Sequence, residues 1–248
     1  MGYYDLRGKA QVPRLLLEYL GVDYQDKKFT IPEWQRFVQT STQDFAFSVL
    51  PFLREGDFVT TDSVPMCTYI INRFGYPDLL GKNLRDRAIV EEYFWTIPFM
   101  ENVITINCQN LPPEELRRYK EKQWNSQVYP RIRKIEEAIS PEGWFLGYLS
   151  IIDFSIYELI RYMDNIFERE IKYLPKMKKI ERMFAELPTI KHYETSPRAV
   201  TEWNPANLLA SYKAMLAQKE KKEKEEALKL KQQQPSKSGA APQSNNPS

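Results

Sequence analysis

The strongest constraint on the fold is a change of pattern near residue 82. Before it, short strand-like and helix-like stretches alternate, and after it every periodic stretch has the spacing of an amphipathic helix. A mixed segment followed by a purely helical one predicts an α/β layer and then an all-α bundle. We therefore expect an α/β domain over 1–75, a linker over 76–82 and an all-helical domain over 83–217.

Within the first 75 residues, the expected elements follow the order strand, helix, strand, hairpin and helix. The helix in AQVPRLLLEYLGV has Pro13 in its first turn and ends at Gly21. The hairpin in VLPFLREGDFVTT turns near Gly56. The last helix opens with the capping pair Asp62-Ser63. This succession favours an α/β layer fold.

The expected helical domain contains one unusually apolar helix, in SIIDFSIYELIRYMDNIF, which opens with Ser150 and Asp153 at the spacing of a capping box. The earlier run NLRDRAIVEEYFWTIPFMENVI is expected to bend or break near Pro98. Residues 218–248 combine a charged stretch, which has Glu and Lys four residues apart, with a tail rich in Gln, Ser and Pro. We expect a charged helical extension there, followed by a disordered tail.

Composition excludes several classes of function. The chain has 35 Lys and Arg against 33 Asp and Glu, a net charge of +2, which predicts no binding to nucleic acid or an anionic membrane. Two cysteines, Cys67 and Cys108, and the single His192 lack the spacing of metal ligands, so no metal is expected. No apolar stretch reaches the roughly 18–20 residues of a membrane span, and no signal-peptide pattern is present. We expect a cytoplasmic protein with reduced thiols.

Motifs from both halves of the chain resemble those of one protein family. GYYDLRGKAQVPRLLLEYLGVDYQDKKF is similar to the opening of tyrosine-type cytosolic glutathione transferases, nearest to the mu, pi and sigma classes. LPFL followed by DS matches the thioredoxin-like half of that family, and GWFLGYLSIIDFSIYELI resembles its helical signature. The match covers residues 1 to about 205, in the right order. It implies a thioredoxin-like domain that binds glutathione as co-substrate, a C-terminal helical bundle, and a homodimer.

The resemblance also implies that Tyr3 is the catalytic residue. Only the thiolate of glutathione is a useful nucleophile, and its thiol has a pKa near that of free cysteine, roughly 8.5. A hydroxyl that donates to the anionic sulfur stabilises it by about 1.5–3 kcal/mol. At about 1.36 kcal/mol per pKa unit, this lowers the pKa of the thiol by about 1–2 units. Without the resemblance, Tyr3 would be interpreted as an ordinary strand aromatic that covers the core.

Four of the implied glutathione-binding residues flank the hairpin. Ser63 and Asp62, at the start of a helix, are expected to hold the γ-glutamyl end of the peptide. Leu50 is expected to offer its backbone to the cysteinyl part, because the resemblance implies that the following Pro51 is cis. For Ser63 the simpler interpretation is an N-cap alone, and both roles are compatible.

Two aromatic residues complete the implied glutathione site. Tyr4 is expected to contact the peptide, and Trp34, in IPEWQRF, to lie over its glycyl end. The competing interpretation of Trp34 is an exposed aromatic in a loop. The second substrate is expected to bind in the helical domain, around Ile104, Cys108 and Leu111.

Four departures from the family pattern oppose catalysis. Only two residues precede Tyr3, so its strand is short, and a loosely held donor loses catalytic value quickly. Asp62 replaces a longer Gln or Glu, Val49 replaces Asn or Gln, and Val38 lies where a basic residue is expected. We prefer a glutathione transferase that conjugates small electrophiles. The alternatives are a non-catalytic scaffold or docking subunit of a larger assembly, with a protein partner at the C-terminal tail, and a carrier of apolar ligands.

Overall fold

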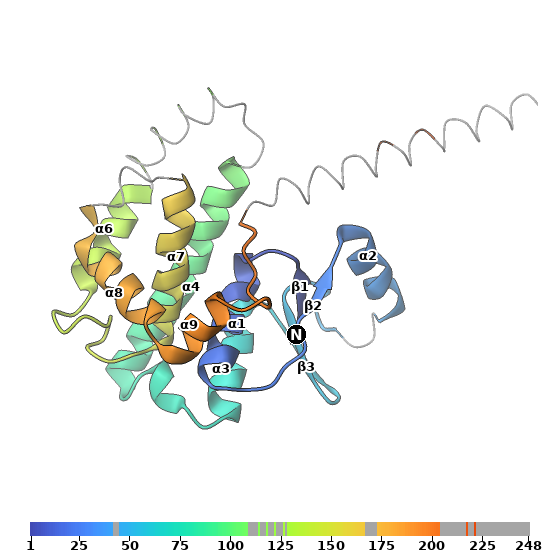
Figure 1. The fold of residues 1–248 in the computed structure, drawn as a ribbon, viewed down its shortest axis with the longest axis horizontal. Coiled ribbons are helices and arrows are strands. Elements are labelled where there is room, and N and C mark those ends of the chain that lie inside the picture. The colour runs from blue at the N-terminus through green and yellow to red at the C-terminus, as the bar shows by residue number, and fades with distance from the viewer. Residues whose placement is uncertain are drawn as a thin grey trace, which may run out of the picture. The chain divides into compact units, whose positions relative to one another are not determined.

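The structure is a computed structural model that describes residues 1–41, 45–108, 128–166 and 173–203, together with residues 114, 118, 122, 126, 217 and 221. Side chains of 101–108 and 165–166 are not among the parts described. Met1–Ala206 form one compact unit, drawn as a ribbon in Figure 1. In the second unit, Asn207–Ser248, only residues 217 and 221 are described, and both are helical. The expected charged extension and tail therefore lie outside the described residues, apart from residue 221.

Four short strands form one mixed sheet in the order β2-β1-β3-β4. They are β1 (Gly2–Tyr4), β2 (Lys27–Phe29), β3 (Phe52–Glu55) and β4 (Phe58–Thr61). β1 runs parallel to β2 and antiparallel to β3, with Gly2 opposite Phe52. β3 and β4 form the predicted hairpin, in which Glu55 faces Phe58 across the turn.

The short first strand has hydrogen-bonded neighbours on both sides. The Lys27 N–H donates to the carbonyl of Met1 at 2.9 Å, and the Met1 ammonium donates to the Gln25 carbonyl at 2.6 Å. A Cβ at Gly2 would lie 2.3 Å from the ring of Phe52, so glycine allows the strand to approach its neighbour closely. These contacts correct the expectation that a strand of this length leaves Tyr3 loosely held.

Three helices cover the two faces of the sheet (Figure 1). They are α1 (Gln11–Tyr19), α2 (Ile31–Thr40) and α3 (Ser63–Arg73). α1 and α3 share the main hydrophobic core on one face, and α2 covers a separate aromatic cluster on the other. The sequence interpretation missed α2, although its capping box was readable: Thr30 Oγ1 accepts from the Glu33 N–H at 3.4 Å, and Glu33 Oε2 accepts from the Thr30 N–H at 2.7 Å.

The described elements that follow residue 83 are all helices, as predicted. They are α4 (Leu84–Cys108), α6 (Tyr129–Ala138), α7 (Ile151–Ile166), α8 (Pro175–Ala185) and α9 (Pro188–Glu194). α7 packs against α4 and α8, and α1 of the α/β part contacts α7 and α9. The helical assignment of α4 continues through Pro98, where a bend or break was expected. None of the helices described is long and apolar enough to cross a bilayer.

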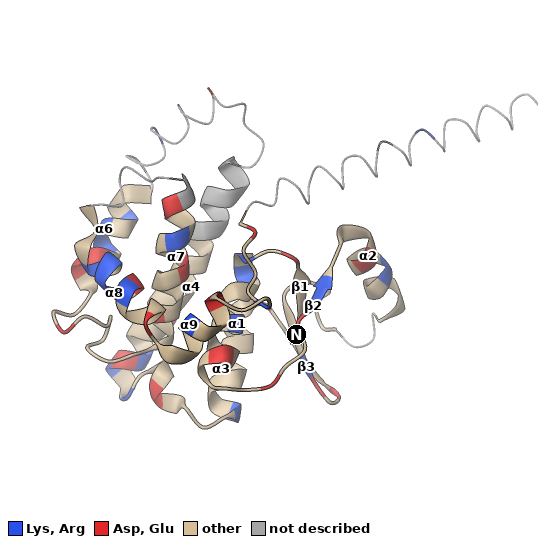
Figure 2. Cartoon of the chain, in the orientation of Figure 1, with Lys and Arg blue, Asp and Glu red and all other residues tan. Residues whose placement is uncertain are grey.

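Two further predictions concern the boundaries and the surface. The stretch 76–82, predicted as a linker, contains the short 3-10 helix η3 (Pro77–Leu80), and the division into domains there stays a prediction. Figure 2 shows Lys and Arg interspersed with Asp and Glu over the described elements. This mixing agrees with the net charge of +2 of the whole chain.

One half of the predicted capping box of α7 is present: the Asp153 carboxylate reaches back to Ser150, while the Asp153 N–H donates to the Ser150 carbonyl at 3.0 Å and not to its hydroxyl. The backbone N–H and the hydroxyl of Ser150 donate to Asp153 Oδ2 at 2.8 and 2.9 Å, and the Phe145 N–H donates to Oδ1 at 2.8 Å. Burial raises the pKa of the Asp153 carboxyl to about 6, against the opposing effect of these donors. Asp153 therefore joins the start of α7 to the loop that precedes it.

Candidate functional site

Tyr3 lies at the turn that joins β1 to α1. Its hydroxyl accepts a hydrogen bond from the backbone N–H of Lys9, in the 3-10 helix η1 (Gly8–Ala10). Gly8 has a φ of +39°, and a Cβ there would lie 2.9 Å from the Tyr3 oxygen and 2.7 Å from a methyl group of Leu6. The turn can therefore close on the hydroxyl only because residue 8 is glycine.

The surroundings of Tyr3 keep its phenol protonated. Burial raises the pKa of Tyr3 to about 12, with smaller upward contributions from Tyr4 and Asp62, while the Lys9 N–H and Arg14 act in the opposite direction. The oxygen accepts from Lys9, so the hydroxyl hydrogen can be donated to an anionic partner. The chemistry available to this group near neutral pH is hydrogen-bond donation, not proton abstraction.

Helix α3 begins beside the same turn. Asp62 is its N-cap, and Oδ1 accepts from the Ser63 N–H at 2.6 Å and from the Ser63 hydroxyl at 3.2 Å. The φ of Asp62 is 71°, a region that non-glycine residues rarely occupy and that costs about 1–3 kcal/mol. Such strain is concentrated at ligand-binding positions. The start of α3 also carries backbone N–H groups and a positive potential, which favour an anionic group.

The segment before β3 contacts the start of α3. The Leu50–Pro51 peptide bond is cis, as the resemblance implied. The Pro51 carbonyl accepts from the Asp62 N–H at 2.9 Å. Tyr3, Leu50, Pro51, Asp62 and Ser63 thus belong to one connected region at the carboxyl end of β1.

Lys9 is a residue of this region that sequence reasoning missed. Its ammonium lies 3.4 Å from Asp62 Oδ2, on half-exposed side chains, while its backbone N–H donates to Tyr3. Lys9 therefore connects the predicted thiolate donor with the predicted γ-glutamyl site. The sequence signal that could have indicated Lys9 is its position directly after Gly8 and before α1, where the loop has to turn back over β1.

Two buried arginines hold the turn in place. Arg7 is 1% exposed and donates to both oxygens of Glu158 on α7, at 3.0 and 2.7 Å. It also donates to Glu194 on α9, at 3.2 and 3.0 Å, and to the Val200 carbonyl at 3.1 Å. Arg14 of α1 donates to the Leu6 carbonyl at 2.9 Å. The segment between Tyr3 and Lys9 is therefore fixed both to α1 and to the helical part.

The structure places the ring of Tyr4 beside that of Tyr3, with centroids 5.6 Å apart, but buries Trp34 in the aromatic cluster under α2. Successive strand residues point to opposite faces, and Tyr4 packs against the aromatic cluster under α2, whose buried members are Phe29, Trp34, Phe45 and Phe52. Trp34 is 8% exposed, lies within α2, and stacks on Phe52 with ring centroids 6.0 Å apart. Trp34 is a buried helix residue, and the interpretation as an exposed loop aromatic is wrong. Binding of glutathione by Tyr4 and Trp34 stays a prediction.

The remaining predicted positions are scattered. Val38 packs against the same aromatic cluster, and Val49 is exposed directly before Leu50. The residues expected around the second substrate, Ile104, Cys108 and Leu111, lie outside the described side chains. Among the described residues, no group of three or more His, Cys, Asp or Glu is placed to hold a metal ion.

The chain is similar to several glutathione S-transferases. A family profile described as "Glutathione S-transferase, C-terminal domain" matches residues 99–197. Glutathione S-transferase Mu 1 of Homo sapiens is 28% identical over 210 residues, covering 80% of this chain and 91% of the relative. Glutathione S-transferase Mu 2 of Mus musculus is 26% identical over 221 residues, covering 83% and 98%. The glutathione S-transferase of Plasmodium falciparum is 25% identical over 211 residues, covering 78% and 93%.

A solved structure supports the fold independently. The structure described as rat hPGDS complexed with a quinoline superposes with a TM-score of 0.68 at 16% identity, covering 80% of this chain and 98% of that one. At this identity the likeness concerns the fold alone. The mixed sheet followed by helices is the glutathione transferase fold, and the chain is similar to glutathione S-transferases over most of their length.

Proposed function

We propose that this protein is a glutathione transferase in which the Tyr3 hydroxyl stabilises the glutathione thiolate for attack on small electrophiles. The observation that carries the proposal is the Tyr3 hydroxyl, held by the Lys9 N–H in the region that also contains Asp62 and Ser63. The proposal assigns the reaction to the cytoplasm, where thiols are kept reduced.

In the proposed complex, the γ-glutamyl carboxylate of glutathione lies at the start of α3, within reach of the Ser63 hydroxyl. The Asp62 carboxylate, which in the free protein accepts from Ser63 and pairs with Lys9, takes the α-ammonium group of the peptide. The sulfur then lies at the Tyr3 hydroxyl. The thiol proton leaves to solvent, the thiolate attacks the electrophilic carbon, and a C–S bond forms as the leaving group departs with its electron pair.

Two measurements test the proposal. The parent protein is expected to bind immobilised glutathione, to elute with free glutathione, and to conjugate a nitroaryl halide. Tyr3→Phe is expected to remain bound to the resin but to conjugate at least tenfold more slowly at pH 6.5, because it lacks the donor. Tyr76→Phe, which changes an exposed tyrosine in the stretch before α4, is the matched control. Equal rates for Tyr3→Phe and the parent would refute the role of Tyr3.

The non-catalytic scaffold remains the competing proposal, and two observations favour it. Trp34, the residue expected over the glycyl end of glutathione, is buried under the sheet, and the Asp62 carboxylate already has a cationic partner in Lys9. A scaffold would pass through the glutathione resin unretained. Retention without turnover of any electrophile would instead identify a carrier.

We also propose that the protein forms a homodimer through α3 and α4. Trp95 and Phe99 are 57% and 63% exposed and lie four residues apart on α4, so they share a face. A cavity of about 690 Å³ adjoins Trp95 and is lined by residues of β4, α3, η3 and α4 that include Phe58, Val64 and Phe94. Exposed apolar surface of this kind marks interfaces. Light scattering is expected to give a dimer for the parent and a monomer for Trp95→Glu; a monomeric parent would refute the dimer.

A further inference from the structure

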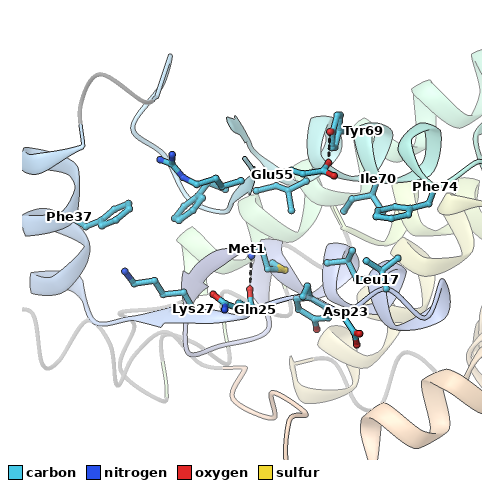
Figure 3. Close-up of a pocket in the computed structure, with 15 residues that line it drawn as sticks. Met1, Leu17, Asp23, Gln25, Lys27, Phe37, Glu55, Tyr69, Ile70 and Phe74 are labelled. Carbon is cyan, nitrogen blue, oxygen red and sulfur yellow. Dashed lines mark hydrogen bonds between the residues drawn. The ribbon is translucent and has the colours of Figure 1, made fainter. Parts of the chain in front are cut away.

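Two sets of contacts fix the ends of β1 and thereby the position of Tyr3. At the amino end, which borders the cavity shown in Figure 3, the Met1 ammonium donates to the Gln25 carbonyl at 2.6 Å. At the carboxyl end, the chain turns through residues 5–10 before α1 begins. This turn contacts residues 196–203, which follow α9 and contain neither helix nor strand. The carboxyl end of β1 therefore depends on a segment that is distant in the chain.

The 196–203 segment holds Arg7 by its backbone and by its side chain. The Arg7 N–H donates to the Glu202 carbonyl at 2.8 Å, and the guanidinium donates to the Val200 carbonyl at 3.1 Å. The half-buried indole of Trp203 lies on the guanidinium, whose central carbon is 4.4 Å from the ring centroid. The electron-rich face of an indole attracts a cation, and more strongly where water is excluded. Trp203 thus covers a guanidinium that is 1% exposed.

Contacts with α1 and α7 hold the 196–203 segment itself. Arg198 forms an ion pair with Glu18 of α1 and lies 5.7 Å from the ring centroid of Tyr24. The ring of Tyr162, on α7, has its centroid 6.1 Å from that of Trp203. The indole therefore has an aromatic neighbour on the helical part as well as the guanidinium of the turn.

Arg7 determines where the groups around the Tyr3 hydroxyl lie. It directly precedes Gly8, where a Cβ would lie 2.9 Å from the Tyr3 oxygen, and Lys9 follows, whose N–H donates to that oxygen. A shift of Arg7 moves both neighbours, because they are one and two peptide units away. A misplacement of about 1 Å at a reacting group can lower the rate about 100-fold. The contact of Trp203 with Arg7 is therefore a step in what holds the hydroxyl.

We propose that Trp203 is a positioning residue for the transferase reaction, because it keeps Arg7 in place and thereby orients the Tyr3 hydroxyl. This inference rests on the proposed function, in which that hydroxyl stabilises the glutathione thiolate. Trp203 acts through Arg7, Gly8 and Lys9 and does not need to touch the peptide. Without the indole, the turn is held less closely, the hydroxyl donates to the sulfur less well, and the pKa of the bound thiol rises.

The test compares Trp203→Leu, which keeps an apolar side chain, with Trp203→Phe, which also keeps an aromatic face for the guanidinium. The bound thiolate is titrated by its ultraviolet absorbance in the full chain. Trp203→Leu is expected to raise the pKa of the bound thiol by about 0.5–1 unit, a part of the roughly 1–2 units that the whole hydroxyl supplies. At pH 6.5 its kcat/KM for a nitroaryl halide should fall about three- to tenfold, with glutathione KM within about twofold. Trp203→Phe should stay within about twofold of the parent.

Two further variants separate positioning from a general loss of structure. Trp144→Leu removes another half-buried indole, which packs against the main core in the loop before α7, and is the matched control. It is expected to lower the free energy of unfolding in urea without changing the pKa of the bound thiol. In the Tyr3→Phe background, Trp203→Leu should give no further rise of that pKa, because the hydroxyl through which it acts is gone.

Several outcomes would overturn the inference. They are an unchanged thiol pKa in Trp203→Leu, the same rise in Trp203→Phe or Trp144→Leu, and an undiminished rise in the Tyr3→Phe background. If Tyr3→Phe raises the thiol pKa and Trp203→Leu does not, only the role of Trp203 is wrong. If the parent binds no glutathione, or Tyr3→Phe leaves the thiol pKa unchanged, the proposed function fails and the role of Trp203 fails with it.

Discussion

Replacing Tyr3 by Phe removes one hydroxyl and leaves the ring that packs against the main core. The hydroxyl accepts from the Lys9 N–H and, in the proposed complex, donates to the sulfur of glutathione. A hydrogen bond to a charged group contributes about 1.5–3 kcal/mol, so its loss raises the pKa of the bound thiol by about 1–2 units. At a pH well below both values, the thiolate fraction and kcat/KM fall by about 10- to 100-fold.

The direction of the pH dependence separates this mechanism from a loss of structure. In the parent, kcat/KM rises with pH as the bound thiol ionises and reaches its plateau at a lower pH than in Tyr3→Phe. The two profiles converge once both thiols are ionised, near pH 9–10 for a free thiol of roughly 8.5. Tyr3 itself, with a pKa of about 12, stays protonated over this range and adds no falling limb.

The assay is the pH profile of nitroaryl halide conjugation, together with titration of the bound thiolate by its ultraviolet absorbance. Tyr76→Phe is the control for removal of an exposed hydroxyl. If the bound thiol has the same pKa in Tyr3→Phe and the parent, or if the rate deficit is the same at every pH, the reasoning about Tyr3 is wrong.

Four further predictions concern the support of the site. Gly8→Ala is expected to place a methyl group against the Tyr3 hydroxyl and lower kcat at least tenfold while glutathione KM changes less, as steady-state kinetics will show. Ser63→Ala is expected to raise glutathione KM about fivefold with kcat within about twofold, because it removes one hydrogen bond made equally in ground and transition states; a fall in kcat alone would contradict this. Arg7→Leu leaves Glu158 buried without its partner and is expected to lower the free energy of unfolding, measured by urea denaturation, by about 3–5 kcal/mol. The double variant that also carries Glu158→Leu should lose less stability, because no buried charge is left unpaired. Burial raises the pKa of Asp153 to about 6, so the protonated carboxyl contributes fully to stability below about pH 4 and loses this contribution as the pH rises through 6. Relative to Asp153→Asn, the free energy of unfolding of the parent should fall by about 3 kcal/mol over this window. Parallel curves of stability against pH for the two proteins would contradict this.

The elements that local sequence signals determine were predictable. The hairpin around Gly56 and the helix after Asp62 depend on turn and capping residues adjacent in the chain, and the structure has both. The capping pair Ser150 and Asp153 is local in the same sense. The helix α2 was equally local, through its capping box at Thr30, and was missed because IPEWQRF was considered only for the role of Trp34.

The features that long-range contacts determine were not predictable. The burial of Trp34 depends on rings from β2, β3 and the loop before β3, which meet only in the folded chain. The link from Lys9 to Asp62 joins residues 53 positions apart. The opposite directions of Tyr3 and Tyr4 were readable from strand alternation alone. Sequence reasoning thus singled out Tyr3 and the start of α3, and missed the contacts of Lys9 that connect them.

The buried Arg7 has a consequence for how the protein opens. Arg7 directly precedes Gly8, which lies against the Tyr3 hydroxyl, and its guanidinium donates to Glu158 of α7, to Glu194 of α9 and to the Val200 carbonyl. Moving this turn away from β1 would leave the buried Glu158 carboxylate without its cationic partner, which costs about 3–5 kcal/mol. Local fraying is thereby suppressed, and amide hydrogens at residues 3 and 9 should exchange with solvent only when the bundle itself melts.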